Sequence, residues 1–143
     1  MSFRMPYAQP ILTLVYNKKC NSSNRALSIL YDALKKHPGV FKLDILDYKK
    51  QPPTKDQLRN ITEYLGVGKD FSTILRKDAS ADAETLNSVD ELEEAIRRRP
   101  EILQRPILVD WDKGKAIVAR PPEKVGDFLK EMGYWKEGEE EHI

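Results

Sequence analysis

Ile11-Leu-Thr-Leu-Val-Tyr-Asn-Lys-Lys-Cys20 passes from an apolar run to a short polar loop and ends on the single cysteine of the chain. The run from Ile11 to Tyr16 predicts a buried strand. The residues after the cysteine predict an amphipathic helix, because apolar side chains recur there at helical spacing. They are Leu27, Leu30, Tyr31 and Leu34. Cys20 is therefore expected where the strand ends and the helix begins, with Asn21, Ser22 and Ser23 as candidate N-caps.

That position favours a reactive thiol. Unpaired backbone N–H groups and the helix dipole stabilise negative charge at a helix N-terminus, and they lower a thiol pKa below its free value of about 8.5. Lys18 and Lys19 are expected to act in the same direction. The alternative is inert packing, because free cysteine is among the most buried residue types. The position of Cys20 leaves both interpretations open.

Size and charge limit the class of protein. The chain has 143 residues and a net charge of +1, from 24 Lys and Arg against 23 Asp and Glu. This suits one domain and gives no reason to expect nucleic acid or an anionic membrane as a partner. No signal peptide and no apolar run of about 18 residues is visible. We therefore expect a monomer in the cytoplasm.

The single cysteine supports the same compartment. It cannot form an internal disulfide, which favours a reducing environment. A second thiol for any redox cycle must then come from outside the chain. Arg4 and the lack of acidic residues in Met1–Gln9 leave a mitochondrial location as an alternative.

The chain divides into residues 1–10 as an N-terminal tail, 11–135 as one domain, and 136–143 as an acidic, disordered C-terminal tail. Within the domain, we expect a helix from Asn21 to Lys36 and a strand from Val40 to Leu46. Strand, helix and strand within so short a segment form a βαβ unit, so the two strands are expected to be parallel.

The second half of the domain is predicted from helix and turn signals. Capping boxes begin helices at Thr54 and Ser88, and the residues between these helices, Lys77 to Asn87, are predicted to be a mobile loop. The last elements are a hairpin over residues 106–119, with Gly114 in its turn, and a helix opened by Pro122. The resulting α/β fold is thioredoxin-like: a four-stranded mixed sheet flanked by helices, with a helical insertion between strands two and three.

Several kinds of site are not supported by the sequence. His37 and His142 lie in a turn and in a tail, so neither suits a zinc site or a Cys–His dyad. No glycine-rich phosphate loop is present. A C-x5-R phosphatase loop also fails, because Ala26 takes the place of the arginine and Arg25 comes one residue early. We therefore predict no metal and no tightly bound cofactor.

Five segments occur in an order and spacing that resemble a known family. They are Asn17-x-x-Cys20-x-x-Ser23, Tyr48-Lys-Lys-Gln-Pro52-Pro53-Thr54-x-x-x-Leu58, Ile74-Leu75-Arg76-Lys77, Arg105-Pro106-Ile107 and Arg120-Pro121. Together they resemble the glutaredoxin-coupled arsenate reductases (ArsC-like), over about Ile11 to Leu129. The resemblance also implies a thioredoxin-like fold.

The resemblance implies roles for individual residues. Cys20 matches the nucleophile that attacks arsenate, with glutathione as co-substrate and glutaredoxin as the protein that resolves the mixed disulfide. Arg76, Arg105 and Arg120 match the family's three anion-binding arginines, and guanidinium groups suit an oxyanion because they donate in pairs. Pro106 matches the cis-proline of the fold. Asn17 and Ser23 match supporting positions around the cysteine.

Three departures from the family pattern leave other functions open. Tyr16 stands where many arsenate reductases have histidine, Lys18-Lys19 replaces a small pair, and Asn24 replaces an arginine, with Arg25 one step later. One alternative is an ArsC-like, glutathione-dependent thiol oxidoreductase or redox sensor of unknown substrate. Another is a non-enzymatic binding module similar to Spx-type regulators. Those commonly use Cys-x-x-Cys, whereas position 23 here is Ser.

Overall fold

The computed structural model describes residues 9–68 and 70–135, with the backbone alone for residues 80–82. The predicted acidic tail and most of the predicted N-terminal tail lie outside this range. The elements follow one another as β1 (Ile11–Tyr16), α1 (Asn21–Lys36), β2 (Lys42–Asp47), α2 (Lys55–Leu65), the 3-10 turn η1 (Lys77–Ala79), α3 (Ser80–Thr85), α4 (Val89–Arg98), η2 (Pro100–Ile102), β3 (Ile107–Asp110), β4 (Lys115–Val118) and α5 (Lys124–Met132).

The sheet has four strands in the order β2-β1-β3-β4. β1 is parallel to β2 and antiparallel to β3, and β3 is antiparallel to β4. The mixed sheet and the helical insertion between its second and third strands are therefore as predicted. In the β3–β4 hairpin, Ile107 pairs with Val118. The turn of this hairpin contains Gly114, whose φ of +65° lies in the left-handed region that favours glycine.

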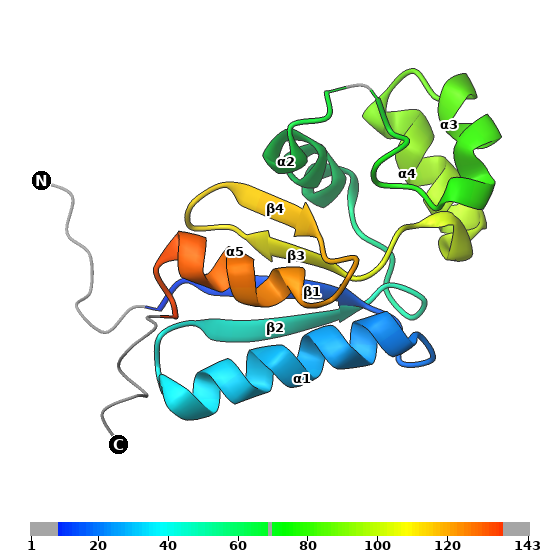
Figure 1. Ribbon diagram of the computed structural model, residues 1–143. Helices are drawn as coiled ribbons and strands as arrows, with labels where there is room; N and C mark the ends of the chain where they lie inside the picture. The colour runs from blue at the N-terminus through cyan, green and yellow to red at the C-terminus, as the bar shows by residue number, and fades with distance from the viewer. Residues whose placement is uncertain (1–8, 69, 136–143) are drawn as a thin grey trace, which may run out of the picture.

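Helices cover both faces of the sheet (Figure 1). α1 and α5 pack on one face, where Leu12, Leu14 and Leu108 are completely buried. α2 packs on the other face, where Val15 and Ile107 are buried, and α4 packs in turn against α2. Neighbouring strand residues thus belong to different cores, as the alternation of side chains along a strand requires.

Two helix boundaries follow from the local signals in the sequence. Thr54 and Gln57 form the predicted capping box: each side chain accepts a hydrogen bond from the backbone N–H of the other, at 3.1 and 2.9 Å. α2 then ends at Gly66 in the left-handed conformation. Ser88 caps α4 by accepting a hydrogen bond from the N–H of Glu91 at 3.2 Å.

Two predictions about the helices were wrong. The buried side of α1 is shifted from the predicted one: Tyr31 is 47% exposed, and the buried residues are Ser23, Ala26, Leu30 and Ala33. Small residues face the sheet because the helix packs closely against it. The predicted mobile loop is also largely helical, forming η1 and α3. Ala79 and Ala83 anchor it by burying their side chains in the core beside α4.

Candidate active site around Cys20

Cys20 itself caps α1. It has extended backbone angles, φ −101° and ψ 121°, and its carbonyl accepts the first helical hydrogen bond from the N–H of Asn24 at 3.0 Å. Its own N–H donates to the carbonyl of Asn17 at 2.9 Å, which closes the loop after β1. The predicted caps Asn21, Ser22 and Ser23 are already helical. The thiol is therefore held half-buried at the helix N-terminus.

The surroundings of Cys20 lower its pKa. Burial alone would raise the pKa of this thiol, but hydrogen bonds to the sulfur outweigh burial. The donors are the N–H and the hydroxyl of Ser23, the side chain of Arg105, and the N–H of Ser22. Lys18 and Lys19, expected from the sequence to contribute, are not among these donors. The site thus favours the thiolate, which is the nucleophilic form of cysteine.

Asn17 and Ser23 hold the cysteine loop in place. Ser23 is completely buried, and its Oγ accepts a hydrogen bond from the N–H of Asn17 at 3.3 Å. The Asn17 side chain accepts from the N–H of Lys19 at 3.0 Å and donates from Nδ2 to the hydroxyl of Tyr48 at 3.3 Å. Because Ser23 also donates to the Cys20 sulfur, the end of β1 and the start of α1 are connected through one hydroxyl group.

Arg105 reaches the thiol from the segment before β3. The Arg105–Pro106 peptide is cis, as the family resemblance implied, and Pro106 is buried. Nη1 of Arg105 donates to the carbonyl of Glu101 at 3.1 Å and also contacts that of Leu103 at 3.4 Å. The guanidinium of Arg105 is therefore held by backbone carbonyls while it hydrogen-bonds the sulfur of Cys20.

Arg120 lies directly against Arg105. Its Nη1 donates to the backbone carbonyl of Arg105 at 2.8 Å. Ile107 pairs with Val118 at the end of the β3–β4 hairpin away from the turn. Arg105 and Arg120 lie two residues beyond this pair on each arm, so the register places them opposite each other. The Arg120–Pro121 peptide is also cis, which the sequence analysis did not anticipate. Two of the three predicted arginines are thus in contact with each other, and one of them, Arg105, reaches the sulfur of Cys20.

Arg76 is placed differently. Its backbone N–H donates to the carbonyl of Ile102 at 2.8 Å, which fixes this residue beside the segment leading to Arg105. Its Nε lies 3.7 Å from the carboxylate of Asp78, so the guanidinium faces a carboxylate within the insertion. The positive charge of Arg76 nevertheless acts on Tyr48, where it partly offsets the rise in the pKa of the hydroxyl that burial causes.

Tyr48 is a member of this site that the sequence analysis did not single out. It is the first residue after β2 and is completely buried. Burial raises the pKa of its hydroxyl, and the negative charge of Cys20 raises that pKa further. The hydrogen bond from Asn17 and the positive charges of Arg105 and Arg76 act in the opposite direction. Tyr48 therefore lies among four of the predicted site residues. Its occurrence in one of the matched segments was the available signal.

The residues that depart from the family pattern interact with one another. The hydroxyl of Tyr16 donates to Oδ1 of Asn24 at 2.6 Å, and Nδ2 of Asn24 donates to the carbonyl of Lys18 at 2.9 Å. This pair joins the end of β1 to the first turn of α1. Arg25, one position later, faces away, since its Nε lies 3.5 Å from the carboxylate of Glu123 before α5.

Other kinds of site find little support. No group of three or more histidine, cysteine or acidic side chains that could hold a metal occurs in residues 9–68 and 70–135. In the same residues, no helix has the length and apolar character needed to cross a membrane.

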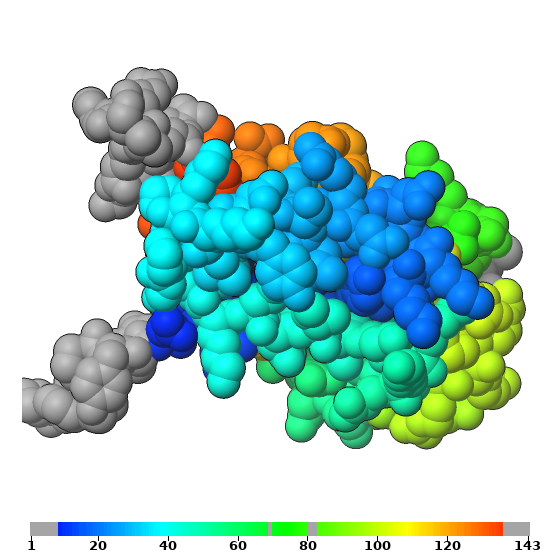
Figure 2. All heavy atoms as spheres, turned by 90° about the horizontal axis from the view of Figure 1, so that it is seen from below, coloured from blue at the N-terminus to red at the C-terminus, as the bar shows by residue number. Residues whose placement is uncertain are grey.

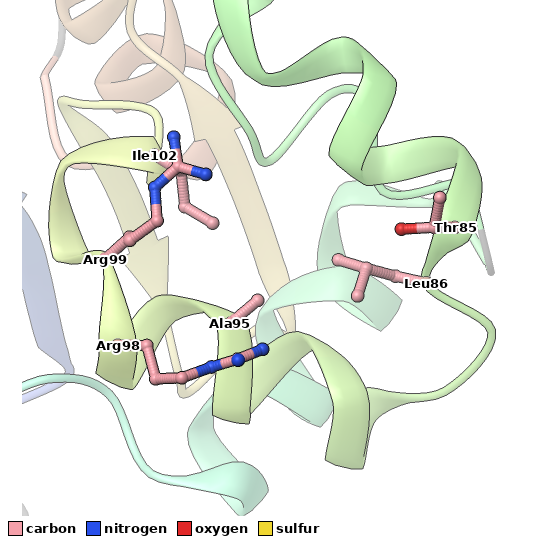
Figure 3. A pocket seen from close by; sticks show the side chains of 6 residues that line it. All are labelled: Thr85, Leu86, Ala95, Arg98, Arg99 and Ile102. Atoms are coloured by element: carbon pink, nitrogen blue, oxygen red, sulfur yellow. The ribbon is translucent and has the colours of Figure 1, made fainter.

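A hollow of about 410 Å³ lies within the helical insertion (Figure 3). Leu86, Ile102 and Arg98 line it, and Arg98 already faces Glu94 at 3.7 Å.

Comparison with known proteins agrees with this geometry. Residues 3–120 match the family model described as "Protein of unknown function (DUF1687)". An arsenate reductase of Haemophilus influenzae is 28% identical over 120 residues, covering 81% of this chain and 97% of that protein.

Solved structures support the same relationship. A putative arsenate reductase from Yersinia pestis is 25% identical with a TM-score of 0.64, covering 81% of this chain and 98% of that one. An arsenate reductase from Vibrio cholerae, 24% identical with a TM-score of 0.66, covers 85% of this chain and all of that chain and shows the same fold. The chain is therefore a member of the DUF1687 family, with an ArsC-like, thioredoxin-like fold.

Proposed function

We propose that this protein is a thiol-dependent oxidoreductase of the arsenate reductase type, in which Cys20 is the nucleophile. The observation that supports this most directly is the hydrogen bonding of the Cys20 sulfur, since Ser23, Ser22 and Arg105 together lower its pKa. Relatives named arsenate reductases support the same class of reaction. Arg105 and Arg120, joined by a hydrogen bond, are the proposed oxyanion-binding pair, and Arg76 is the third ligand once it exchanges Asp78 for the anion.

The proposed reaction has three steps. The Cys20 thiolate attacks the arsenic of arsenate and forms a sulfur–arsenic bond as one oxygen leaves as water. The thiolate of glutathione then attacks the Cys20 sulfur. The electron pair of the sulfur–arsenic bond passes to arsenic, which leaves as arsenite, and a Cys20–glutathione disulfide remains. Glutaredoxin finally takes up the glutathione and releases the Cys20 thiolate.

A coupled assay tests this proposal. Arsenate-dependent oxidation of NADPH is measured with glutathione, glutaredoxin and glutathione reductase present. The native protein is expected to turn over, and Cys20→Ser is expected to be inactive because serine cannot form the thiolate adduct. Lack of turnover by the native protein would end the arsenate proposal. The single cysteine, which depends on external thiols in this scheme, favours the reducing cytoplasm as the setting, and we propose that the protein acts there as a monomer.

A second candidate is a glutathione-dependent thiol oxidoreductase that does not act on arsenate. The ion-paired position of Arg76 favours it, because that guanidinium does not converge with Arg105 and Arg120 on one ligand. Rapid glutathionylation of Cys20 without arsenate turnover would support this candidate. The lowered pKa of Cys20 argues against the non-enzymatic binding module, which has no use for a thiolate.

A further inference from the structure

A small basic hollow lies beside the cysteine loop. Its volume is about 190 Å³, and it is formed where the loop after β1 meets the segment after β2. Both segments lie along the side of the molecule shown in Figure 2. Six residues line the hollow: Asn17, Lys18, Lys19, Asp47, Lys49 and Lys50.

The positive charge of this hollow is not neutralised within the described chain. All four lysines are exposed, and no carboxylate of residues 9–68 and 70–135 forms an ion pair with them. Asp47 contributes the one carboxylate, and its Oδ1 accepts a hydrogen bond from the N–H of Lys49 at 3.3 Å. A group of four cations around a single anion, open to solvent, attracts a ligand with more negative than positive charges.

The hollow shares residues with the loop that carries Cys20. Asn17 is 5% exposed, and its carbonyl accepts the hydrogen bond from the N–H of Cys20. Lys19 is the residue directly before Cys20, and its N–H donates to the Asn17 side chain. The lysines of this hollow thus stand next to Cys20 along the chain, whereas Arg105 approaches the sulfur from the segment before β3.

We propose that this hollow binds the charged end of the thiol co-substrate and thereby selects glutathione over uncharged thiols. Glutathione has two carboxylates and one ammonium group, which match the lysines and Asp47 in sign. This inference rests on the proposed function, in which a glutathione thiolate attacks the sulfur of Cys20. The Lys18-Lys19 pair, one of the three departures from the family pattern, then helps to determine which thiol is used.

The test uses a reaction that needs no arsenate. The Cys20 thiolate attacks oxidised glutathione, forms a Cys20–glutathione disulfide and releases the other glutathione as a thiolate, so atoms and electrons balance. The second-order rate constant is measured by mass spectrometry for oxidised glutathione and for the uncharged 2-hydroxyethyl disulfide. The proteins compared are the native chain, each lysine-to-glutamine variant and the quadruple variant Lys18→Gln, Lys19→Gln, Lys49→Gln and Lys50→Gln.

Each single variant is expected to slow the reaction with oxidised glutathione by roughly two- to fivefold, and the quadruple variant by more than tenfold. The reaction with the uncharged disulfide is expected to stay unchanged, because the thiolate itself is not altered. Added salt is expected to reduce the difference, since the charges are exposed. Lys35→Gln, at the far end of α1, is the matched control and is expected to behave like the native chain.

Three results would overturn the proposal. One is an unchanged rate with oxidised glutathione in the quadruple variant. Another is an equal loss with both disulfides, which would mean that the lysines act on the thiol. The third is a normal rate with oxidised glutathione but slower release by glutaredoxin, which would assign the lysines to the protein partner. All three can be read even if arsenate is not a substrate, so they are independent of the coupled assay.

Discussion

Arg105 offers the sharpest test of how this site stabilises the thiolate. Arg105→Gln removes the positively charged guanidinium that hydrogen-bonds the Cys20 sulfur. A shorter, uncharged polar side chain takes its place. A hydrogen bond to a charged group contributes about 1.5–3 kcal/mol, and the half-buried position of Arg105 favours the lower end. Because about 1.4 kcal/mol corresponds to a factor of ten, the thiolate population, and with it the rate, is expected to fall roughly tenfold at pH values below the native midpoint.

The assay is the rate of Cys20 alkylation by iodoacetamide over a range of pH. The native thiol has a lowered pKa, so its thiolate persists to more acidic pH than a free cysteine. Arg105→Gln is expected to move the midpoint of the profile to higher pH. The rates of the two proteins should converge above both midpoints, where both thiols are ionised.

The control for this experiment is Arg59→Gln. Arg59 is exposed on α2 and pairs with Asp56 at 2.9 Å, so its loss changes the net charge equally without touching the site. This variant is expected to keep the native midpoint. Superimposable profiles for Arg105→Gln and the native protein would refute the reasoning, because Arg105 would then contribute nothing to the thiolate.

Three further substitutions test other parts of the structure. Ser23→Ala should raise the midpoint of Cys20 alkylation because it removes a hydroxyl donor, whereas Ser22→Ala should not, since Ser22 contributes only its N–H. Tyr48→Phe keeps the buried ring but leaves an amide donor unpaired, so urea unfolding should show a loss of about 1–3 kcal/mol. Tyr134→Phe removes a 2.7 Å hydrogen bond to the completely buried Asp110, and thermal unfolding should show a loss of about 1.5–3 kcal/mol. An unchanged stability in either tyrosine variant would contradict the assigned hydrogen bond.

Local signals accounted for much of the fold. β1 and α1 have the predicted bounds, because an apolar run followed by helical spacing leaves few alternatives. The capping box at Thr54 and the glycine ends of α2 and α5 are local features in the same sense. The strand predicted from Val40 is shifted, and β2 begins at Lys42. Strand ends depend on pairing with β1, which is a tertiary effect.

The errors have a common physical origin. Residues Lys77 to Asn87 are polar enough to suggest a loop, but Ala79 and Ala83 are buried in the core shared with α2 and α4, and such tertiary burial stabilises a short helix that local signals do not predict. Tyr31 has an apolar ring at a helical position, yet it is 47% exposed, because Ser23, Ala26, Leu30 and Ala33 are the α1 residues that face the core. Tyr48 was missed as a site member because its role depends on contacts with Asn17 and Arg105, far away in the sequence.

The β3–β4 hairpin sets the separation of the proposed oxyanion-binding pair. Arg105 and Arg120 occupy mirror positions on the two arms, so their spacing is counted from the turn at Gly114. An insertion that shifted the register between β3 and β4 by one residue would move one guanidinium along the sheet. The hydrogen bond from Arg120 to the carbonyl of Arg105 would then be lost. The register set at this turn therefore fixes the spacing of two arginines at the opposite end of the hairpin, and a change of register would separate the two proposed ligands without altering either side chain.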